Sequence, residues 1–475
     1  MEETRFFFGR EHEQAELFKV IRSANNSHGI LFYIKGEVGT GKTYLVENFL
    51  DGIEDQIEII RIRGIEYLKD DAYFGLRMLL RSIWRIEETS EENLTEVIDN
   101  FFNSNVIISF IKPYIKWFLK LPLNEREQFI INNLQDSDKQ DMALGSVINL
   151  IKYISHEKTL VIFIDDLHFL DRSTSVFIRY LSHEIKNRRI LGIFTSLPEF
   201  NLEKEFNITR IDEMILTNFT KSETGEYIAA SEDCEKVDPK LIDFIYKRCK
   251  GNPLFIFEFM ALIREKEFLK REDNTLTLQT TFSNIPNKVS QIILSRYNYL
   301  KTPYKKLLKK GSIFGNEFSD LMLTKMSGDV DLNIFLDYLV EKKFIEKSQH
   351  LAKESEGENI YRFCHTSIRD IIYNTMAPDE RSIYHKVAGE VFEREFSGIA
   401  NDNLNIMIHH FKKGNVKDKY ITYLLQSAKE KVQDFELSEA ESSFMQLLDE
   451  GVKTSEVYKG LGDVYFKLEE YKKAL

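Results

Sequence analysis

The sequence is short of the residues that mark secreted, membrane-spanning or disulfide-linked proteins. Its 475 residues include three cysteines, Cys234, Cys249 and Cys364, which lie far apart and form no CxxC pair, so we expect free thiols in a reducing cytosol. No window holds 18 uncharged apolar residues, and the N-terminal segment lacks the basic, apolar character of a secretion leader. We therefore predict a cytoplasmic protein that makes no membrane contact.

Positive charge is also scarce. The chain has 64 Lys and Arg against 76 Asp and Glu, a net charge of −12. This argues against a sequence-independent nucleic-acid binder, which needs clustered cations to displace counterions, so direct DNA binding is not expected, although a small basic patch is compatible with the total. The ten histidines fall into no metal-ligand spacing, so no zinc site is predicted.

What the chain does contain is enough apolar sequence for several domains. Hydrophobic residues make up 43% and charged residues 29%, as in ordinary folded proteins, and the length predicts three or four domains. Strand-like and helix-like segments alternate up to about Asn218. The strand-like ones are Gly29–Lys35, Gln56–Arg63, Thr159–Ile164, Arg189–Ser196 and Met214–Thr217. Such alternation predicts an α/β domain over 1–218, a parallel sheet flanked by helices, with a helical insertion at about 70–152.

The next two units are predicted from the turn-forming segments that interrupt or precede their helical stretches. From Lys221 to about Arg271 the pattern is helical, interrupted by a Gly-Asn-Pro turn at 251–253, which predicts a helical lid over 219–282. The segment Asn284–Asn287 (NIPN) opens a third unit over 283–396. It contains helical stretches at 290–308, 319–326, 333–342, 366–374 and 381–395, and β-like stretches at 344–349 and 361–363. Helices followed by a β-hairpin predict a winged helix.

An internal repeat marks the last unit, 397–475. Small or bulky residues recur 34 residues apart in three pairs: Leu424 with Tyr458, Ala428 with Gly462, and Ala440 with Ala474. This is the period of tetratricopeptide repeats, in which small residues let paired helices approach and aromatic residues fill the gap. One and a half repeats are too few for a stable array. We therefore expect a fragment of a longer protein, or an array capped by the preceding helices.

A glycine-rich turn between a strand and a helix carries the clearest functional motif. It matches GxxxxGK[ST] with the residues Gly36, Glu37, Val38, Gly39, Thr40, Gly41, Lys42 and Thr43. Glycines let backbone N–H groups turn toward phosphates, Lys42 reaches the β- and γ-phosphates, and the Thr43 hydroxyl takes one Mg²⁺ position. The sequence therefore predicts bound ATP or ADP with Mg²⁺, and we count Tyr44 among the nucleotide contacts. An ordinary glycine-rich turn is the alternative interpretation.

Two carboxylates follow a buried strand downstream. Asp165 and Asp166 come directly after the apolar run that ends at Ile164. In a P-loop protein the first holds Mg²⁺, usually through water, and the second polarises the attacking water, so Asp166 and Lys42 are our catalytic candidates. An acidic turn after a strand is otherwise common. Thr195 and Ser196 end the following strand, and we name Ser196 as a γ-phosphate contact, with a polar strand end lacking any ligand as an equal alternative.

Five motifs occur in an order that resembles the signal-transduction NTPases with numerous domains, the STAND branch of AAA-type ATPases. They are FGRE from Phe8, the P-loop, DDLHFLD from Asp165, GNPLF from Gly251 and YRFCHTSIRD from Tyr361. The chain looks most like the bacterial subgroup in which the ATPase precedes tetratricopeptide repeats, and the resemblance covers nearly its whole length.

The resemblance implies roles for particular residues. Phe8, Gly9 and Arg10 match the segment that wraps the adenine end, and Pro253 matches the proline that packs on the base. His365 matches a winged-helix histidine that touches the β-phosphate of ADP and locks a closed resting state, although a partly buried structural histidine is the plainer interpretation. One departure is that the tract from Thr195 to Leu197 lacks the arginine with which many relatives sense the γ-phosphate. This implies slow hydrolysis or another sensor, and no arginine finger can be placed.

The predicted function is a nucleotide-dependent switch. ADP would hold a closed form, and a protein partner or small ligand sensed through the repeats would permit exchange for ATP, opening and self-association, with weak ATP hydrolysis. Two alternatives remain: a cycling AAA-type ATPase that remodels protein or DNA complexes, and an interaction scaffold locked by its nucleotide.

Overall fold

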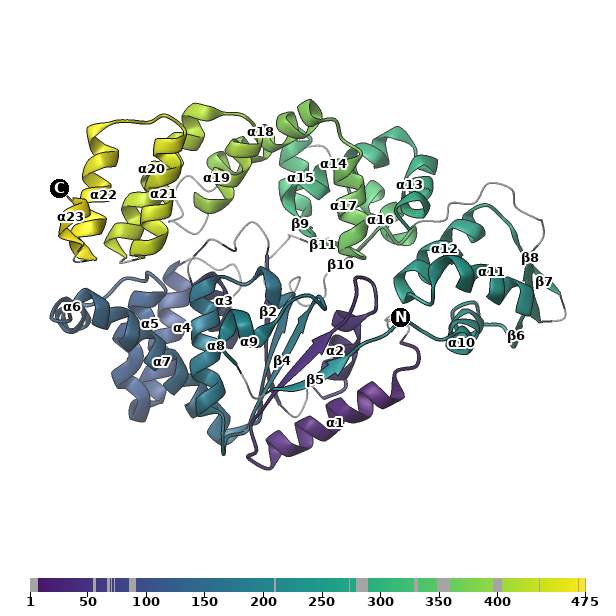
Figure 1. Cartoon of the computed structure of the whole chain (residues 1–475), viewed down its shortest axis with the longest axis horizontal. Helices are drawn as coiled ribbons and strands as arrows, with labels where there is room; N and C mark the ends of the chain where they lie inside the picture. The colour runs from purple at the N-terminus through teal and green to yellow at the C-terminus, as the bar shows by residue number, and fades with distance from the viewer. Residues whose placement is uncertain are drawn as a thin grey trace.

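The structure, a computed structural model, describes residues 7–53, 57–65, 69, 71, 73–84, 91–208, 211–272, 274–278, 289–328, 332–347, 359–395, 404–434, 436–468 and 470–474. The predicted opening segment Asn284–Asn287 lies outside these ranges. Figure 1 shows a parallel-sheet domain along one side of the molecule and the later elements running back over it, so that the C-terminus lies above the helices α5 and α6. Within the described ranges, no helix has both the length and the apolar surface that crossing a bilayer requires.

The sheet domain is built on five parallel strands in the order β2-β3-β4-β1-β5. Their bounds are β1 Ile30–Lys35, β2 Glu58–Arg63, β3 Leu160–Asp165, β4 Ile190–Ser196 and β5 Asp212–Ile215. Every residue of β3 and β4 is buried, as their unbroken apolar runs predicted. The α/β prediction is confirmed, and only β5 lies two residues earlier than expected.

Helices cover both faces of this sheet because successive strand residues alternate between the faces. Phe32 and Ile34 pack with α1 and α2, whereas Leu31 and Tyr33 pack with the insertion and its neighbours. The helices and 3₁₀ turns are α1 Glu11–Asn25, α2 Lys42–Asp51, α3 Phe74–Ile83, α4 Glu91–Ser104, η3 Val106–Ile111, α5 Lys112–Phe118, α6 Glu125–Asn132, α7 Asp136–Glu157, η4 Leu167–Phe169, α8 Arg172–Glu184 and α9 Leu202–Phe206. Helices α3–α7 are the predicted insertion, between β2 and β3.

The second group of elements, which we call the middle unit, contains α10 Lys221–Ser231, β6 Lys236–Val237, α11 Pro239–Cys249, α12 Pro253–Glu265, β7 Leu269–Glu272 and β8 Thr275–Leu278. The all-helical prediction for 221–271 was wrong, because three strands pair here in the order β6-β8-β7. The cause is local. Asn274 turns the chain with φ of 58°, and the following Thr-Leu-Thr-Leu alternates as a strand does, burying Leu276.

A small-sheet unit follows. It comprises α13 Val289–Tyr299, α14 Thr302–Phe314, β9 Glu317–Ser319, α15 Asp320–Met326, α16 Asn333–Glu341, β10 Ile345–Lys347, β11 Ile360–Phe363, α17 Thr366–Asn374 and α18 Pro378–Glu395. The predicted single helix 290–308 was wrong, since it breaks after Tyr299 and restarts with Pro303 in the first turn of α14, where proline is favoured. The three strands are antiparallel in the order β10-β11-β9, and β9 was not predicted.

The C-terminal hairpins are the helices α19 Leu404–Lys413, α20 Lys417–Gln433, α21 Leu437–Asp449, α22 Ser455–Lys467 and α23 Tyr471–Ala474. Helices α20 and α22 end 34 residues apart, and α21 and α23 begin 34 residues apart, which matches the period read from the sequence. Phe444 is fully buried, and a Cβ at Gly460 would lie 2.2 Å from its ring. Gly460 thus lets α22 lie close to this aromatic ring, and the tetratricopeptide assignment stays a prediction.

Candidate nucleotide site

The glycine-rich turn joins the end of β1 to the start of α2. Gly39 and Gly41 have φ of 83° and 92°, which L side chains rarely adopt, and no atom lies within 4 Å of a Cβ built at Gly41. Lys42 is buried, and its Nζ donates to the carbonyl oxygens of Gly36 at 2.7 Å and Glu37 at 3.2 Å. The lysine therefore folds back over its own loop and holds its charge where the turn opens.

Strand order brings the first predicted carboxylate to this turn. Because β4 lies between β1 and β3, the ends of all three strands meet at one edge. The Thr43 hydroxyl donates to Asp165 Oδ1 at 2.9 Å, and the Thr195 hydroxyl donates to the same oxygen at 2.5 Å. A carboxylate beside a hydroxyl is the oxygen ligand set that Mg²⁺ prefers. Thr43 and Asp165 thus fit the ion that P-loop ATPases use with their nucleotide.

The second carboxylate is held in an uncommon backbone conformation. Asp166 has φ of 54°, and its N–H donates to Thr195 Oγ1 at 3.0 Å. Burial, then the charge of Asp165, raises the pKa of Asp166 to about 6, against the pull of nearby Arg63. A carboxylate poised near neutral pH can polarise a water molecule or accept its proton. The strained turn and the tuned pKa both fit the predicted catalytic position.

Arg63 is a site residue that the sequence analysis missed. It ends β2, and the parallel register pairs it with Asp165. Its guanidinium lies 3.9 Å from Asp165 Oδ2, 3.6 Å from Asp166 Oδ2 and 3.6 Å from Glu317 Oε1. These carboxylates raise the pKa of Arg63 despite the opposing effect of burial. One cation therefore links the two site carboxylates to β9 of the small-sheet unit.

The two hydroxyls at the end of β4 face different partners. Thr195 contacts Asp165, as described above. The buried Ser196 hydroxyl is hydrogen-bonded to the Tyr33 hydroxyl. The hydroxyl that does not donate in this bond can donate to a backbone carbonyl, that of Leu197 at 2.9 Å from Ser196 or that of Phe200 at 3.1 Å from Tyr33. Ser196 as a phosphate contact stays a prediction, and Thr195 is the residue of this strand end whose hydroxyl contacts Asp165.

The middle unit docks directly on the P-loop. Asn252 Nδ2 donates to the Val38 carbonyl at 2.9 Å, and the Leu254 N–H donates to the Gly39 carbonyl at 3.2 Å. A Cβ at Gly39 would lie 2.7 Å from Asn252 Oδ1, so the close approach requires glycine there. Pro253 stands between these two bonded residues, in the first turn of α12. The Gly-Asn-Pro turn is thus held against the phosphate-binding loop.

The segment before α1 bridges the same two parts. Arg10 donates to the Thr217 carbonyl at 2.6 Å and the Thr40 carbonyl at 3.4 Å, with its guanidinium 4.8 Å from the Phe219 ring centre. Phe8 packs edge-on against Phe219 at 6.0 Å, and Tyr44 stacks on Phe7 at 5.7 Å. Gly9 has φ of 64°, which lets the chain turn between Phe8 and Arg10. Their contact with a base stays a prediction.

His365 caps α17, with its Nδ1 accepting from the Ser367 N–H at 3.1 Å. Burial, then the charges of Lys42 and Arg63, lowers the pKa of His365 to about 4. A neutral ring whose Nδ1 accepts must carry its proton on Nε2, which is then free to donate to an oxygen. The electrostatic effect of Lys42 and Arg63 indicates that the ring lies near the site; its phosphate contact stays a prediction.

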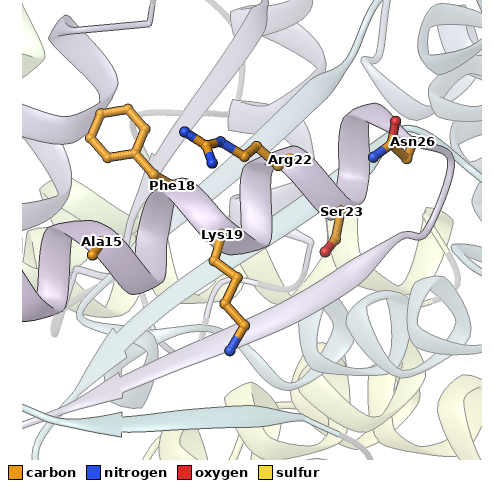
Figure 2. A pocket seen from close by; sticks show the side chains of 6 residues that line it. All are labelled: Ala15, Phe18, Lys19, Arg22, Ser23 and Asn26. Carbon is orange, nitrogen blue, oxygen red and sulfur yellow. The ribbon is translucent and has the colours of Figure 1, made fainter.

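A hollow of about 470 Å³ elsewhere does not compete with this site. Six residues of α1 and its end line it: Ala15, Phe18, Lys19, Arg22, Ser23 and Asn26. Figure 2 shows that Phe18, Arg22 and Asn26 leave the helix on one side and Lys19 and Ser23 on the other. Its polar groups do not converge, which a ligand site would require.

Comparisons with known proteins found one family model and several solved structures that are similar to this chain. Residues 7–193 match the family described as AAA ATPase domain. A signal transduction ATPase with numerous domains and a tetratricopeptide repeat sensor, from Pyrococcus horikoshii, is similar in structure with a TM-score of 0.50 and 17% identity, over 99% of this chain and 63% of that one. Cdc6p from Pyrobaculum aerophilum has a TM-score of 0.35 and 12% identity, over 82% of this chain and 96% of that one.

No curated protein matches the chain in sequence. The chain spans 63% of the length of the Pyrococcus protein. An AAA ATPase domain binds nucleotide, and the roles of Thr43 and Asp165, which hydrogen-bond to each other beside the P-loop, stay predictions. Residues 7–193 therefore match the AAA ATPase domain family, and the chain is similar in fold to a signal-transduction ATPase with numerous domains.

Proposed function

We propose that the chain is an ATP/ADP-binding switch of the STAND type, closed with ADP and opened or oligomerised with ATP. One observation carries the proposal: two later units of the chain contact the nucleotide site in the same structure. Asn252 of the middle unit bonds to the P-loop, and Glu317 of the small-sheet unit pairs with Arg63 beside the site carboxylates. A ligand that binds only when these contacts are made stabilises the closed arrangement.

Nucleotide would be held from all three parts. The P-loop N–H groups and Lys42 take the phosphates, and the segment Phe8–Arg10 with Tyr44 and Pro253 encloses the base. The middle unit is the lid in this proposal, and the small-sheet unit is the winged helix. The Nε2–H of His365 donates to the β-phosphate, so ADP alone is sufficient to join the small-sheet unit to the P-loop.

Hydrolysis is slow in this proposal. Thr43 and Asp165 would hold Mg²⁺, which when bound offsets the charge of the β- and γ-phosphates. Asp166 orients the attacking water, and the Arg63 guanidinium lies 3.9 Å from Asp165 Oδ2 and 3.6 Å from Asp166 Oδ2. The tract after β4 supplies hydroxyls from Thr195 and Ser196 but no arginine, so the γ-phosphate lacks one stabilising cation found in many relatives. Signalling therefore depends on exchange more than on turnover.

The stimulus would act at a second contact on the ATPase domain. Asp434, between α20 and α21, pairs with Lys120 of the insertion at 2.5 Å, and its carbonyl accepts from Gln140 at 3.5 Å. Next to it Glu436 is buried, with the charges of Arg77 and Lys120 close by. A protein partner or small ligand that binds the C-terminal hairpins would compete with this contact and release them.

The test is to denature the purified chain and identify the released nucleotide by chromatography. The proposal predicts stoichiometric ADP, released slowly from native protein and faster from His365→Ala. His183→Ala is the control, because His183 is an exposed histidine on α8. An empty site with weak ATP binding and steady turnover would favour the cycling ATPase instead. ADP that ATP never displaces would favour the locked scaffold.

A further inference from the structure

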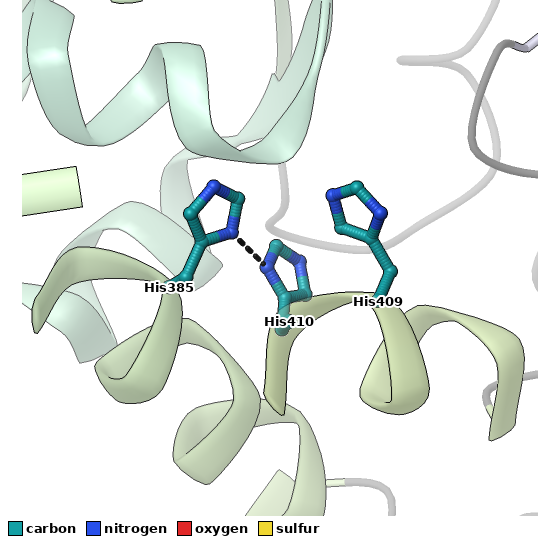
Figure 3. Close-up of side chains that lie close together, drawn as sticks. All are labelled: His385, His409 and His410. Carbon is teal, nitrogen blue, oxygen red and sulfur yellow. Dashed lines mark hydrogen bonds between the residues drawn. The ribbon is translucent and has the colours of Figure 1, made fainter. Parts of the chain in front are cut away.

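Three histidines meet where the small-sheet unit joins the C-terminal hairpins. His385 lies on α18, and His409 and His410 lie on α19. One ligand nitrogen from each lies within 4.8 Å of the other two. Figure 3 shows the three imidazoles gathered at one place, and their ring centres are 5.2, 5.4 and 5.5 Å apart. The rings thus form a nearly equilateral triangle.

This triangle has the dimensions of a metal site. With Zn–N bonds of about 2.0–2.1 Å in tetrahedral geometry, bound nitrogens lie about 3.4 Å apart and imidazole centres about 5 Å apart. The ring centres already have that spacing. His385 Nδ1 and His410 Nδ1 are 2.9 Å apart and hydrogen-bonded, so they need to separate by about 0.5 Å to accept an ion between them. Small side-chain rotations are sufficient.

The protonation of the rings also suits a cation. Burial lowers the pKa of His385 to about 3 and that of His409 to about 4, and it lowers the pKa of His410 well below its usual value. All three are therefore neutral at neutral pH. His385 Nε2 lies 2.9 Å from the Tyr373 hydroxyl, which can accept a hydrogen bond from the Nε2–H and so leave the Nδ1 lone pair toward the triangle. His410 then needs only to move its proton from Nδ1 to Nε2.

We propose that His385, His409 and His410 form a binding site for one divalent transition metal ion of the Zn²⁺ class. Three imidazole nitrogens select Zn²⁺, Cu²⁺, Ni²⁺ or Co²⁺ over the oxygen-seeking Mg²⁺ and Ca²⁺. The site is therefore separate in chemistry as well as in place from the Mg²⁺ position beside the P-loop. Half-buried His409 lies on its solvent side, where a water molecule can complete four-fold coordination.

The residues around the three histidines set the affinity for the metal ion and the structural effect of binding it. Lys413, Arg369 and Arg381 contribute positive charge near the rings, which opposes a second cation. We therefore expect weaker binding than at a structural zinc site with thiolate ligands. Because one ligand comes from α18 and two from α19, a bound ion ties the small-sheet unit to the first hairpin helix and fixes the angle at which the hairpins leave it.

The test uses the full chain, treated with chelator and dialysed, and titrated with Co²⁺ as a visible probe. One Co²⁺ per chain should give the intense absorption of tetrahedral coordination, displaced by Zn²⁺ and unaffected by millimolar Mg²⁺. His409→Gln, at a half-buried position, should abolish the band while the circular dichroism spectrum stays unchanged. His183→Gln, on the exposed face of α8, should bind as the wild type does.

Two results would overturn the proposal: no tetrahedral Co²⁺ band in the wild type, or a band that survives in His409→Gln. His385→Ala is less decisive because that ring is fully buried and its loss can disturb folding. Lys42→Ala should retain the band, so failure of the nucleotide proposal and failure of this one are distinguishable.

Discussion

The ATPase domain is contacted at two places by later parts of the chain, and the two contacts are built differently. The middle unit contacts the P-loop through neutral hydrogen bonds, from Asn252 to Val38 and from Leu254 to Gly39, over a glycine that leaves no room for a side chain. The C-terminal hairpins contact the insertion through the Lys120–Asp434 ion pair, about one-third exposed on each side, and through buried Glu436.

This difference indicates which of the two contacts is the more stable and which one a stimulus can break. Hydrogen bonds to backbone carbonyls at a fixed glycine turn depend little on salt or pH. A partly exposed ion pair contributes little free energy, and a buried carboxyl costs energy to ionise. We infer that the P-loop contact secures the nucleotide and that the hairpin contact is the one a stimulus can break.

The largest expected effect is a loss of nucleotide affinity when Lys42 is replaced. Lys42→Ala should weaken ATP and ADP binding by about 100-fold, because a charge-assisted bond to phosphate contributes about 1.5–3 kcal/mol. Isothermal titration calorimetry measures it. Lys35→Ala is the control, since Lys35 ends β1 and pairs with Glu213 at 3.0 Å outside the loop. Binding retained within a few-fold in Lys42→Ala would refute the P-loop assignment.

Asp166→Asn should slow ATP hydrolysis and leave intact the two contacts that later parts of the chain make with the ATPase domain. Loss of the carboxylate that polarises water should slow hydrolysis by about 100-fold or more, with ADP affinity nearly unchanged. Wild-type hydrolysis should itself fall as the pH drops through about 6, where Asp166 becomes protonated. A phosphate-release assay measures both, with exposed Asp212→Asn as the control. Unchanged turnover in Asp166→Asn would remove this residue from the reaction.

Asn252→Ala tests the contact between the middle unit and the P-loop. It removes the bond to Val38 and the cap of α12, in which the side chain accepts from the Phe255 N–H, and should destabilise the closed form by about 1–2 kcal/mol. ADP release should become about tenfold faster, as stopped-flow fluorescence can measure. Asn201→Ala is the matched control, because Asn201 caps α9 and its Oδ1 accepts from the Lys204 N–H at 3.0 Å. Equal release rates in the two variants would contradict the lid role.

Lys120→Ala tests the contact between the insertion and the C-terminal hairpins. Loss of the pair with Asp434 should reduce the free energy of unfolding by less than about 1 kcal/mol while exposing this face of the insertion. Hydrogen exchange should rise in α5 and at the start of α21. Lys417→Ala is the control, since Lys417 pairs with Glu450 inside the hairpins at 3.3 Å. If exchange rises equally in both variants, the hairpins do not rest on Lys120.

The contact between the C-terminal hairpins and the insertion should also depend on pH. Burial raises the pKa of Glu436 from 4.5 to about 7, so its contribution to closure is complete below about 4.5 and is lost as the pH rises through about 7. Opening should increase about tenfold between pH 6 and pH 8 in wild type. Glu436→Gln should remove this dependence, and Glu450→Gln should keep it. The same pH profile in wild type and Glu436→Gln would contradict the assignment.

The sequence predicted those site features that are encoded locally. A buried strand, a glycine turn and a helix follow one another around Lys42, and Asp165 follows an unbroken apolar strand, so the contact between Thr43 and Asp165 could be expected. Arg63 could not, because only the pairing of β2 with β3, about 100 residues away, places it opposite Asp165. Nothing in its own segment marks it as a site residue.

Tertiary packing decided the other omissions. Strands β7 and β8 are four residues each and pair around Asn274. Segments this short carry too little two-residue alternation to indicate strands, so the helical pattern that precedes them dominated the prediction. The histidine triangle joins His385 to His409 and His410 across two helices, at a spacing no metal motif uses. Domain limits and the contacts of Ser196, Pro253 and His365 with nucleotide stay predictions.

The most direct test of the switch is the distance between the insertion and the hairpins. Spin labels at Gln128→Cys on α6 and Lys459→Cys on α22, both exposed positions, can be measured by double electron–electron resonance, with the singly substituted chains as background. We predict one short, narrow distribution with ADP and a longer, broader one with a non-hydrolysable ATP analogue, most clearly in Lys120→Ala. Identical distributions with both nucleotides, in wild type and in Lys120→Ala, would contradict a nucleotide-controlled closure.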